Sequence, residues 1–367
     1  MAVLEGNPAD RVPMWLLFPY HPIGCYVDVR TRPGYRPVFE ASKERAIMLN
    51  RRNLHVPVFS PEVARCHESL TEDGWQITRD HVEWKDIRLF SETRRRDGEV
   101  RIKKLIENED DLLAFCRLPV NTDRAAIRSE LEKQMPRYQQ EKQEFPMEYG
   151  AMMLDLGEPI GTLYSSSNLT EYPIWSVTQN DAVTGLLDRL MERSRAIYDF
   201  CLERDLADVY FLVGSELASP PMVSRATFQQ WIVPHARELI ASIHAAGKKA
   251  IQHYHGQIRE VLPDFLTMRP DAIHTIEAPP NGNCTFTQAF DIVGSSIALI
   301  GNIQYDLFRS SSQPDMRRAV MEVIDECRGK RLILSPSAGP YEEAVSDNVI
   351  RNYLEFMNAA WEYGRCP

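Results

Sequence analysis

A regular alternation of short apolar segments and longer amphipathic segments runs through the sequence from about residue 150 onward. The segments at 182–203 and 225–246 carry apolar residues at helical spacing and are long enough to cover a sheet. Alternation of this kind is typical of βα units that build a parallel sheet. Six strands are predicted in this region, at residues 151–155, 208–213, 249–253, 272–276, 297–301 and 331–335.

The first 60 residues have to supply two more strands if the sheet closes into an eight-stranded barrel. Residues 11–18 form a short apolar run around Pro13 that is followed by Pro19, which suits a buried strand. A helical patch is expected near residues 39–49. The competing architecture is a doubly wound open sheet, but no GxGxxG or Walker-type loop follows the first strand. We therefore predict an α/β fold of the (β/α)8 TIM-barrel type.

Before residue 150 the pattern changes to short alternating runs joined by turn signals. Asp-Gly pairs at 73–74 and 97–98 are strong signals for tight hairpins. The runs that they separate are residues 75–79, 87–91 and 99–103. We predict a single barrel domain over residues 1–367 with an antiparallel β-hairpin insertion at 68–106. The helices expected after it are residues 107–116 and 123–148.

Charge and cysteine content narrow the classes of function. A net charge of −10 repels polyanions, so nucleic acid is not expected as a partner. No apolar stretch approaches the roughly 18 residues that span a membrane, and the first residues lack the pattern of a signal peptide. The seven cysteines are scattered and include no CxxC, so they do not indicate a disulfide framework. These features predict a cytoplasmic protein with reduced, mostly buried cysteines.

Polar side chains follow the predicted strands at the points where each strand ends. In (β/α)8 enzymes the reacting groups lie at the C-terminal ends of the strands and in the loops that follow them. We therefore expect one site at this mouth of the barrel. Its candidate residues are Glu216, His253, His255, His274, Glu277, Asn302, Gln304, Ser335 and Tyr341.

The most informative segment among them is His253-Tyr254-His255. Side chains two apart on a strand share a face, so both imidazoles are expected to face the barrel axis and Tyr254 the helix layer. Two histidines and one carboxylate, from Glu216 or Glu277, would suit a catalytic zinc site with an open position. The same histidines could instead transfer protons, bind substrate or hydrogen-bond neighbouring loops.

From about residue 173 to residue 363 the chain resembles the uroporphyrinogen decarboxylase-like superfamily. This superfamily includes the decarboxylase itself and cobalamin-dependent methyltransferases that move methyl groups from a corrinoid protein to a thiol such as coenzyme M. The order and spacing of several motifs carry the resemblance. They are Gly214-Ser-Glu216-Leu-Ala-Ser-Pro-Pro221, His244-Ala-Ala-Gly-Lys248, His253-Tyr-His255-Gly256, Asp271-Ala-Ile-His274, Glu277-Ala-Pro-Pro280, Leu299-Ile-Gly-Asn302-Ile-Gln304 and Leu334-Ser-Pro-Ser-Ala-Gly-Pro-Tyr341.

In the thiol methyltransferases the resemblance implies a zinc site made of a His-x-Cys pair and a later cysteine. His253 matches the family histidine, while His255 stands where the first cysteine would be and Ala338 where the second would be. The thiolate-rich zinc site is therefore not reproduced. A site of nitrogen and oxygen ligands from His253, His255 and Glu216, or with Glu277 in place of Glu216, stays open.

A second difference between this sequence and the family argues against porphyrinogen decarboxylation. The porphyrinogen decarboxylases carry an arginine-rich run near the N-terminus that grips the many carboxylates of their substrate. The equivalent stretch at residues 16–24 contains no arginine, although Arg30, Arg32 and Arg36 follow it. An octa-anionic substrate would therefore lack its counterions.

The favoured interpretation is a methyltransferase that works with a corrinoid protein on a small methyl donor or acceptor, with the cobalamin supplied by that partner. His253, His255 and Glu216 would hold the zinc, while His274, Glu277 and Tyr341 would be catalytic. Substrate would be bound by Asn302, Gln304 and Ser335. The alternatives are a metal-independent decarboxylase or lyase of a small carboxylated substrate and a non-catalytic binding protein. The family resemblance also implies a homodimer.

Overall fold

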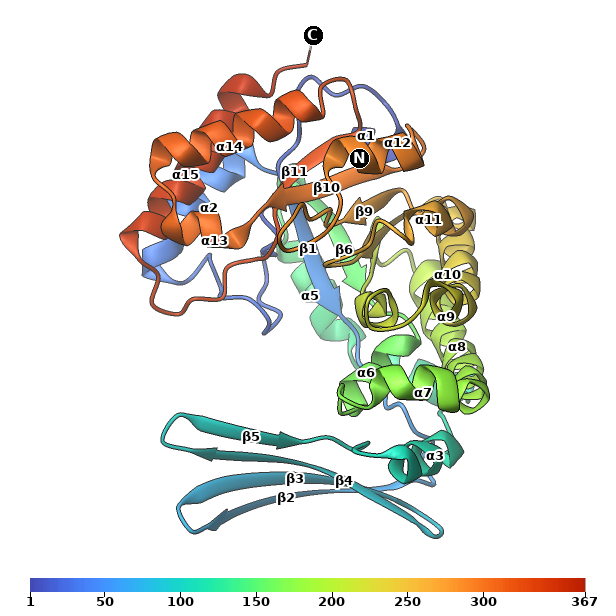
Figure 1. The fold of residues 1–367 in the computed structure, drawn as a ribbon. Helices are drawn as coiled ribbons and strands as arrows, with labels where there is room; N and C mark the ends of the chain where they lie inside the picture. Colours follow the sequence, from blue (N-terminus) through green and yellow to red (C-terminus); the bar gives the residue numbers. More distant parts are fainter. Residues whose placement is uncertain (367) are drawn as a thin grey trace.

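A parallel, curled sheet of seven strands forms the centre of the molecule in the computed structural model, which describes residues 1–366 (Figure 1). Each strand pairs in parallel with the next in the order β1-β6-β7-β8-β9-β10-β11. The strands are β1 (Met48–Asn53), β6 (Gly150–Asp155), β7 (Val209–Leu212), β8 (Lys249–His253), β9 (Ala272–His274), β10 (Ala298–Ile303) and β11 (Leu332–Pro336). The six strands predicted after residue 150 are confirmed, with ends that differ by at most two residues.

A short segment at Met14 and Trp15 joins the two edges of this sheet. The Trp15 amide donates to the Leu334 carbonyl at 2.9 Å, and the Ile47 amide donates to the Met14 carbonyl at 2.8 Å. Both bridges are parallel, so the segment occupies the eighth position between β11 and β1. The expected α/β barrel is confirmed, and the apolar run at residues 11–18 provides its closing segment.

Alternate side chains of the strands enter two separate cores. One set fills the barrel interior and includes Trp15, Leu49, Met153, Phe211 and Ile300. The other set faces the surrounding helices and belongs to the larger core between sheet and helices. Strand side chains alternate between the two faces of the sheet. A residue at a strand end therefore faces the interior when it lies two positions after an interior residue of the same strand.

Helices cover the outside of the sheet, with α2, α13, α14 and α15 on one side and α8 to α11 on the other (Figure 1). The α-helices are α1 (Ala2–Glu5), α2 (Arg36–Arg45), α3 (Glu109–Arg117), α4 (Arg124–Glu132), α5 (Met135–Glu144), α6 (Ile160–Ser166), α7 (Tyr172–Thr178), α8 (Asn180–Glu203), α9 (Arg225–Trp231), α10 (Val233–Ala245), α11 (Leu262–Met268), α12 (Phe286–Val293), α13 (Tyr305–Ser310), α14 (Gln313–Glu326) and α15 (Asp347–Tyr363). Short 3-10 helices are η1 (Pro33–Tyr35), η2 (Met147–Tyr149) and η3 (Ser215–Ala218). No helix among residues 1–366 combines the length and the apolar character that crossing a membrane requires.

Three helix predictions need correction. The helices expected at 123–148 and 225–246 are each broken in two, and a proline stands in the first turn of the second part in both cases, Pro136 in α5 and Pro234 in α10. Proline lacks an amide hydrogen and its ring crowds the preceding turn, so the earlier helix ends before it. The helix expected near 39–49 ends at Arg45, because the residues after it enter β1.

The antiparallel insertion forms a separate sheet of four strands, which lies beside α3 and apart from the parallel strands (Figure 1). Its strands are β2 (Ala64–Glu72), β3 (Trp75–Trp84), β4 (Ile87–Arg96) and β5 (Glu99–Lys103). Both Asp-Gly pairs make the predicted tight turns, with φ of 50° at Asp73 and Asp97 and positive φ at both glycines. The sheet begins at residue 64, four residues before the predicted start of the insertion.

The cysteines of this chain are all free thiols. Cys201, Cys284 and Cys327 are buried as expected, but Cys25, Cys66 and Cys366 are exposed. The prediction that most of them fill the core is therefore wrong.

Candidate functional site

Six polar residues of the strands face the barrel interior at its C-terminal mouth. Each lies two residues beyond an interior apolar residue of its own strand, so the alternation of strand side chains brings them to the same face. The mouth of a (β/α)8 barrel is where such enzymes bind substrate. The six residues are Arg51, Asp155, His253, His274, Asn302 and Ser335.

His253 and His274 form a neutral imidazole pair above the apolar interior. Their rings stack with centroids 4.9 Å apart, and their Nδ1 atoms are 2.7 Å apart. The ring of Trp15 lies 5.5 Å from that of His274, and Phe211 packs on both histidines. Burial lowers the pKa of His253 well below its ordinary value and that of His274 to about 3. One ring must therefore donate its Nδ1 hydrogen and the other must accept it.

His255 and Glu277 form an acid–base pair at the surface of the mouth. Glu277 Oε2 lies 3.2 Å from His255 Nδ1 and accepts a hydrogen bond from the Gly256 amide at 2.7 Å. Burial by itself would raise the pKa of Glu277, but these hydrogen bonds outweigh it and hold the pKa below its ordinary value. An ionised carboxylate can only accept, so His255 Nδ1 carries the hydrogen. The His255 side chain is 41% exposed, which leaves Nε2 open to the mouth.

Arg51 and Asp155 form an ion pair in the same mouth. Arg51 Nε donates to Asp155 Oδ2 at 3.0 Å, a second contact comes from its NH2 group, and the guanidinium lies 5.1 Å from the centre of the Phe211 ring. The sequence prediction missed Arg51 because β1 had not been located. A strand at Met48–Asn53 would have put Arg51 on the interior face, two positions after Leu49.

Glu216 lies in η3, directly after β7, and its carboxylate is held by its own loop. Its Oε2 accepts from the Gly214 amide at 3.0 Å, and burial raises its pKa, with hydrogen bonds from the backbone of Glu216 and Gly214 opposing the rise. A second carboxyl group, on Glu158, is buried behind it. Burial raises the pKa of Glu158 to about 7, and the charge of Glu216 adds to the rise. Sequence reasoning missed Glu158, because it lies three residues beyond β6 and no periodic pattern extends to it.

The remaining expected residues occupy different parts of the mouth. Gln304 Oε1 accepts from Asn281 at 2.7 Å and from Ser337 at 3.3 Å, so Gln304 is bound to the neighbouring loops. The fully buried Ser335 donates to the Pro336 carbonyl. Tyr341 is 48% exposed and packs on Tyr305, with its ring under the Arg309 guanidinium.

Of the zinc ligands expected from the sequence, His253 and His255 lie close together, with ring centroids 4.6 Å apart, but they form no three-ligand group with Glu216 within residues 1–366. Tyr254 faces the helix layer and packs on Phe228 and Phe265, as the strand geometry predicts. His253 Nδ1 is engaged by His274, while the carboxylate of Glu216 is turned onto Gly214. Within residues 1–366 there is no group of three histidine, cysteine or acidic side chains that could hold a metal ion. The structure therefore shows no zinc site in this mouth among residues 1–366.

Comparison with known proteins identifies relatives of the barrel. Residues 161–359, more than half of the chain, match the family model described as uroporphyrinogen decarboxylase (URO-D). The search of curated proteins found no match. Among solved structures, a methyltransferase from Methanosarcina mazei is similar with a TM-score of 0.57 and 15% identity, over 99% of this chain and 97% of that chain. At this identity the likeness shows a shared fold.

Proposed function

This chain belongs to the uroporphyrinogen decarboxylase (URO-D) family, and from that premise we propose that it is a methyltransferase of a corrinoid-dependent methyl-transfer system. The observation that carries the proposal is the His255–Glu277 pair, an acid–base group at the mouth of the barrel. The fold likeness to a methyltransferase along nearly the whole of both chains supports it. The methyl group would pass between a small molecule bound in the mouth and a corrinoid protein docked over it.

His255 supplies the proton transfer that such a reaction needs. In the direction of a thiol acceptor, His255 Nε2 would take the proton of the thiol. The sulfur would then form its bond to the methyl carbon while the bond between the methyl group and the corrinoid donor breaks and leaves its electron pair with the donor. In the reverse direction the corrinoid acceptor would supply the electron pair for the new bond to the methyl carbon, while the heteroatom that loses its methyl group would keep the old bonding pair and take the proton from Nε2. Glu277 fixes the orientation of the ring and stabilises the imidazolium that forms.

Other residues of the mouth bind and orient the small molecule. Asn302 faces the interior beside the paired strand end at Ser335, and we assign both to substrate binding. Gln304 holds the loop next to Glu277, and Tyr341 lies at the outer rim. The neutral His274 keeps His253 in place through the bond between their Nδ1 atoms and gives the floor of the site a hydrogen-bonding, uncharged surface.

Decarboxylation of a porphyrinogen is not supported by the charges of this mouth. Arg51 faces the interior but is already paired with Asp155. Arg32 pairs with Glu343 at the surface, and the guanidinium of Arg30 stacks on Tyr20. The pairing of Arg51, Arg32 and Arg30 with groups of the protein leaves these three cations unavailable to a substrate with eight carboxylates.

The test measures methyl transfer directly, using methylcobalamin as the donor and coenzyme M and other small thiols as acceptors. We expect the protein to accelerate the loss of methylcobalamin absorbance in the presence of one of these thiols. Removing the base in His255→Ala should lower the rate about 100-fold or more, and Glu277→Gln should lower it less. His67→Ala is the matched control, because His67 is exposed on β2, pairs with Asp80 and lies outside the barrel.

Two results would contradict the proposal. Full turnover in His255→Ala would remove the assigned base. Release of CO2 from small carboxylic acids without any loss of methylcobalamin would instead identify the protein as a decarboxylase.

A further inference from the structure

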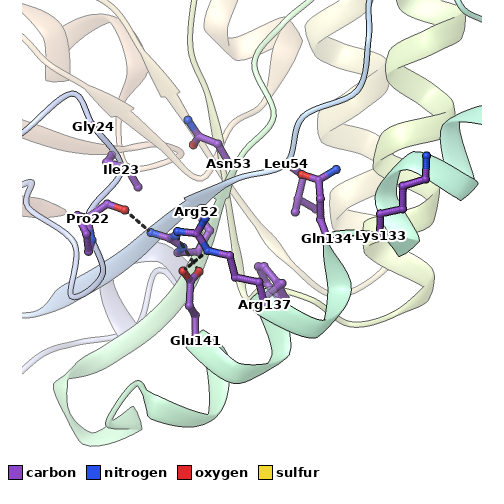
Figure 2. A pocket seen from close by; sticks show the side chains of 11 residues that line it. Pro22, Ile23, Gly24, Arg52, Asn53, Leu54, Lys133, Gln134, Arg137 and Glu141 are labelled. Carbon is purple, nitrogen blue, oxygen red and sulfur yellow. Dashed lines mark hydrogen bonds and ion pairs between the residues drawn. The ribbon is translucent and has the colours of Figure 1, made fainter.

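A polar cavity lies on the outer side of β1, separate from the barrel mouth. Its volume is about 530 Å³, and it is enclosed by the end of β1, the loop at Pro22–Gly24 and the start of α5 (Figure 2). Successive strand side chains point to opposite faces, so Arg51 enters the barrel interior and Arg52 enters this cavity. The two sites therefore lie back to back across one strand.

Cations dominate the lining of this cavity. Arg52, Lys133 and Arg137 line it, against the single carboxylate of Glu141 (Figure 2). Arg52 NH2 lies 2.7 Å from Glu141 Oε2, and Arg137 Nε lies 3.0 Å from Glu141 Oε1, so one acid serves two arginines. Lys133 pairs with Glu130, which does not line the cavity. This local excess of positive charge contrasts with the net charge of −10 of the chain.

Arg52 is a buried residue of the cavity wall, and hydrogen bonds hold its side chain in place. It is 7% exposed, and its NH1 group donates to the carbonyls of Pro22 and His21 at 2.9 and 3.1 Å. Its Nε is buried and has no hydrogen-bond partner among residues 1–366. Burial lowers the pKa of Arg52, with the charge of Glu141 opposing the fall. A buried, fixed guanidinium that shares its only acid stabilises an additional negative charge nearby.

The start of α5 adds to this positive potential. The helix begins at Met135, next to Lys133 and Gln134 of the cavity, and no side chain caps its N-terminus. Pro136 in the first turn has no amide hydrogen to offer, so the contribution of this end is the positive pole of the helix dipole, which favours an anion. Cavities of about 300–1,000 Å³ take small organic ligands, so a volume of about 530 Å³ holds more than a bare ion.

We propose that this cavity is a binding site for a phosphate group, free or as the ester of a small molecule, held by Arg52, Lys133 and Arg137. The ligand would also touch the Pro22–Gly24 loop. The residues that follow this loop reach the mouth, where Tyr26 packs against Gly339 so closely that a Cβ on Gly339 would lie 2.6 Å from its ring. Occupation of the cavity would thus fix the loop that connects the two sites.

The test uses isothermal titration of the full chain with inorganic phosphate and with glycerol 3-phosphate at constant ionic strength. Lys133→Ala/Arg137→Ala removes the two surface cations and keeps the buried Arg52. Arg124→Ala/Arg128→Ala is the matched control, because it removes two cations from α4 that pair with Asp199 and Glu203 outside the cavity. Both double variants change the net charge equally and are checked for an unchanged circular dichroism spectrum.

We expect one or both phosphates to bind to the wild-type chain, and the affinity to fall about tenfold or more in Lys133→Ala/Arg137→Ala but not in the control. The tighter ligand then tells whether the free ion or the ester is preferred. Absence of binding to the wild-type chain would overturn the proposal, as would equal weakening in both double variants, which would show only a general charge effect. None of these readouts depends on methyl transfer, so this proposal and the proposed function fail independently.

Discussion

Glu158 is a buried acid that has no cation beside it among residues 1–366. It lies behind the mouth next to Ser215 and Gln252, and one of its carboxylate oxygens has no hydrogen-bond partner among residues 1–366. Burial raises the pKa of this carboxyl group more than the hydrogen bonds from Ser215 and Gln252 lower it. The carboxyl group therefore keeps its proton up to about pH 7. The consequence is a pH dependence of stability that can be measured without knowing the substrate.

We predict that the free energy of unfolding of the wild-type protein falls as the pH rises from about 4.5 to about 7, and that Glu158→Gln abolishes this fall. The unfolded chain releases the proton of Glu158 near pH 4.5, whereas the folded chain keeps it to about pH 7, so rising pH favours unfolding across this window. A shift of this size corresponds to at most roughly 3 kcal/mol. In urea unfolding at pH 5 and pH 8, the advantage of Glu158→Gln over wild type should be larger at pH 8.

A surface acid provides the comparison for this experiment. Glu148 is exposed, so Glu148→Gln should leave the difference between pH 5 and pH 8 as it is in the wild-type chain. If Glu158→Gln behaved in the same way as Glu148→Gln, the carboxyl of Glu158 would be ionised in the folded protein and the assignment would be wrong.

Which site residues can be found from sequence depends on whether their strand can be found. The segment of His253 and His255 follows a clear apolar strand, so its alternation and its position at the mouth could be predicted. Arg51 could not, because its strand reads Met-Leu-Asn-Arg-Arg-Asn and is two-thirds polar. Its polar residues have tertiary partners: Asn50 bonds His21, Arg51 pairs with Asp155 and Arg52 pairs with Glu141. Hydrophobic periodicity carries no signal for such a strand.

Hairpins and helix ends could be predicted from the sequence where a single local signal, such as a turn residue, determined the structure. The hairpins of the four-stranded sheet were predicted because Asp-Gly specifies a tight turn whatever surrounds it. The helix breaks at Pro136 and Pro234 were missed because apolar spacing continues across each break and masks the proline. At the element scale, the turn residues therefore predict local stability most directly.

We predict that Gly98→Ala destabilises the β4–β5 hairpin alone, by about 1 kcal/mol. Gly98 has φ of 85°, and no atom lies within 4 Å of the position of a new Cβ, so the cost comes from the backbone and not from a clash. Hydrogen exchange should become faster in β5 and the paired end of β4, while the amides of the parallel strands keep their protection.

Gly185→Ala gives a control of opposite sign. Gly185 lies inside α8, and its nearest neighbour for a new Cβ is the flexible end of Arg189 at 3.9 Å. Alanine is the better helix former, so this variant should gain up to about 1 kcal/mol. Faster exchange throughout the barrel of Gly98→Ala would show that the two sheets unfold together and would contradict the prediction.

The two ends of the barrel have different tasks in the whole molecule. At the mouth, interior positions hold ion pairs and imidazoles that are costly to bury. At the opposite end, Val3 and Leu4 of α1 enter the interior core, and Arg331, just before β11, donates to both of their carbonyls at 3.0 Å. The sequence alone could not predict this contact, because the partners are more than 300 residues apart and α1 has only four residues. The apolar packing at this opposite end therefore has to offset the free-energy cost of the buried polar groups at the mouth.

We predict that Leu4→Ala lowers the stability of the protein by roughly 2–4 kcal/mol and leaves the chemistry at the mouth intact. Leu4 is 4% exposed and belongs to the interior core, so its truncation opens a cavity at the closed end. The midpoint of thermal unfolding should fall, whereas the rate of methylcobalamin consumption at 25 °C should match that of the wild-type chain. Val100→Ala, at an exposed position on β5, should change neither value.

A fall in rate at a temperature where Leu4→Ala is fully folded would mean that packing at the closed end sets the geometry of His255 and Glu277. The barrel would then act as one continuous unit, in which a stability variant and a site variant could not be separated.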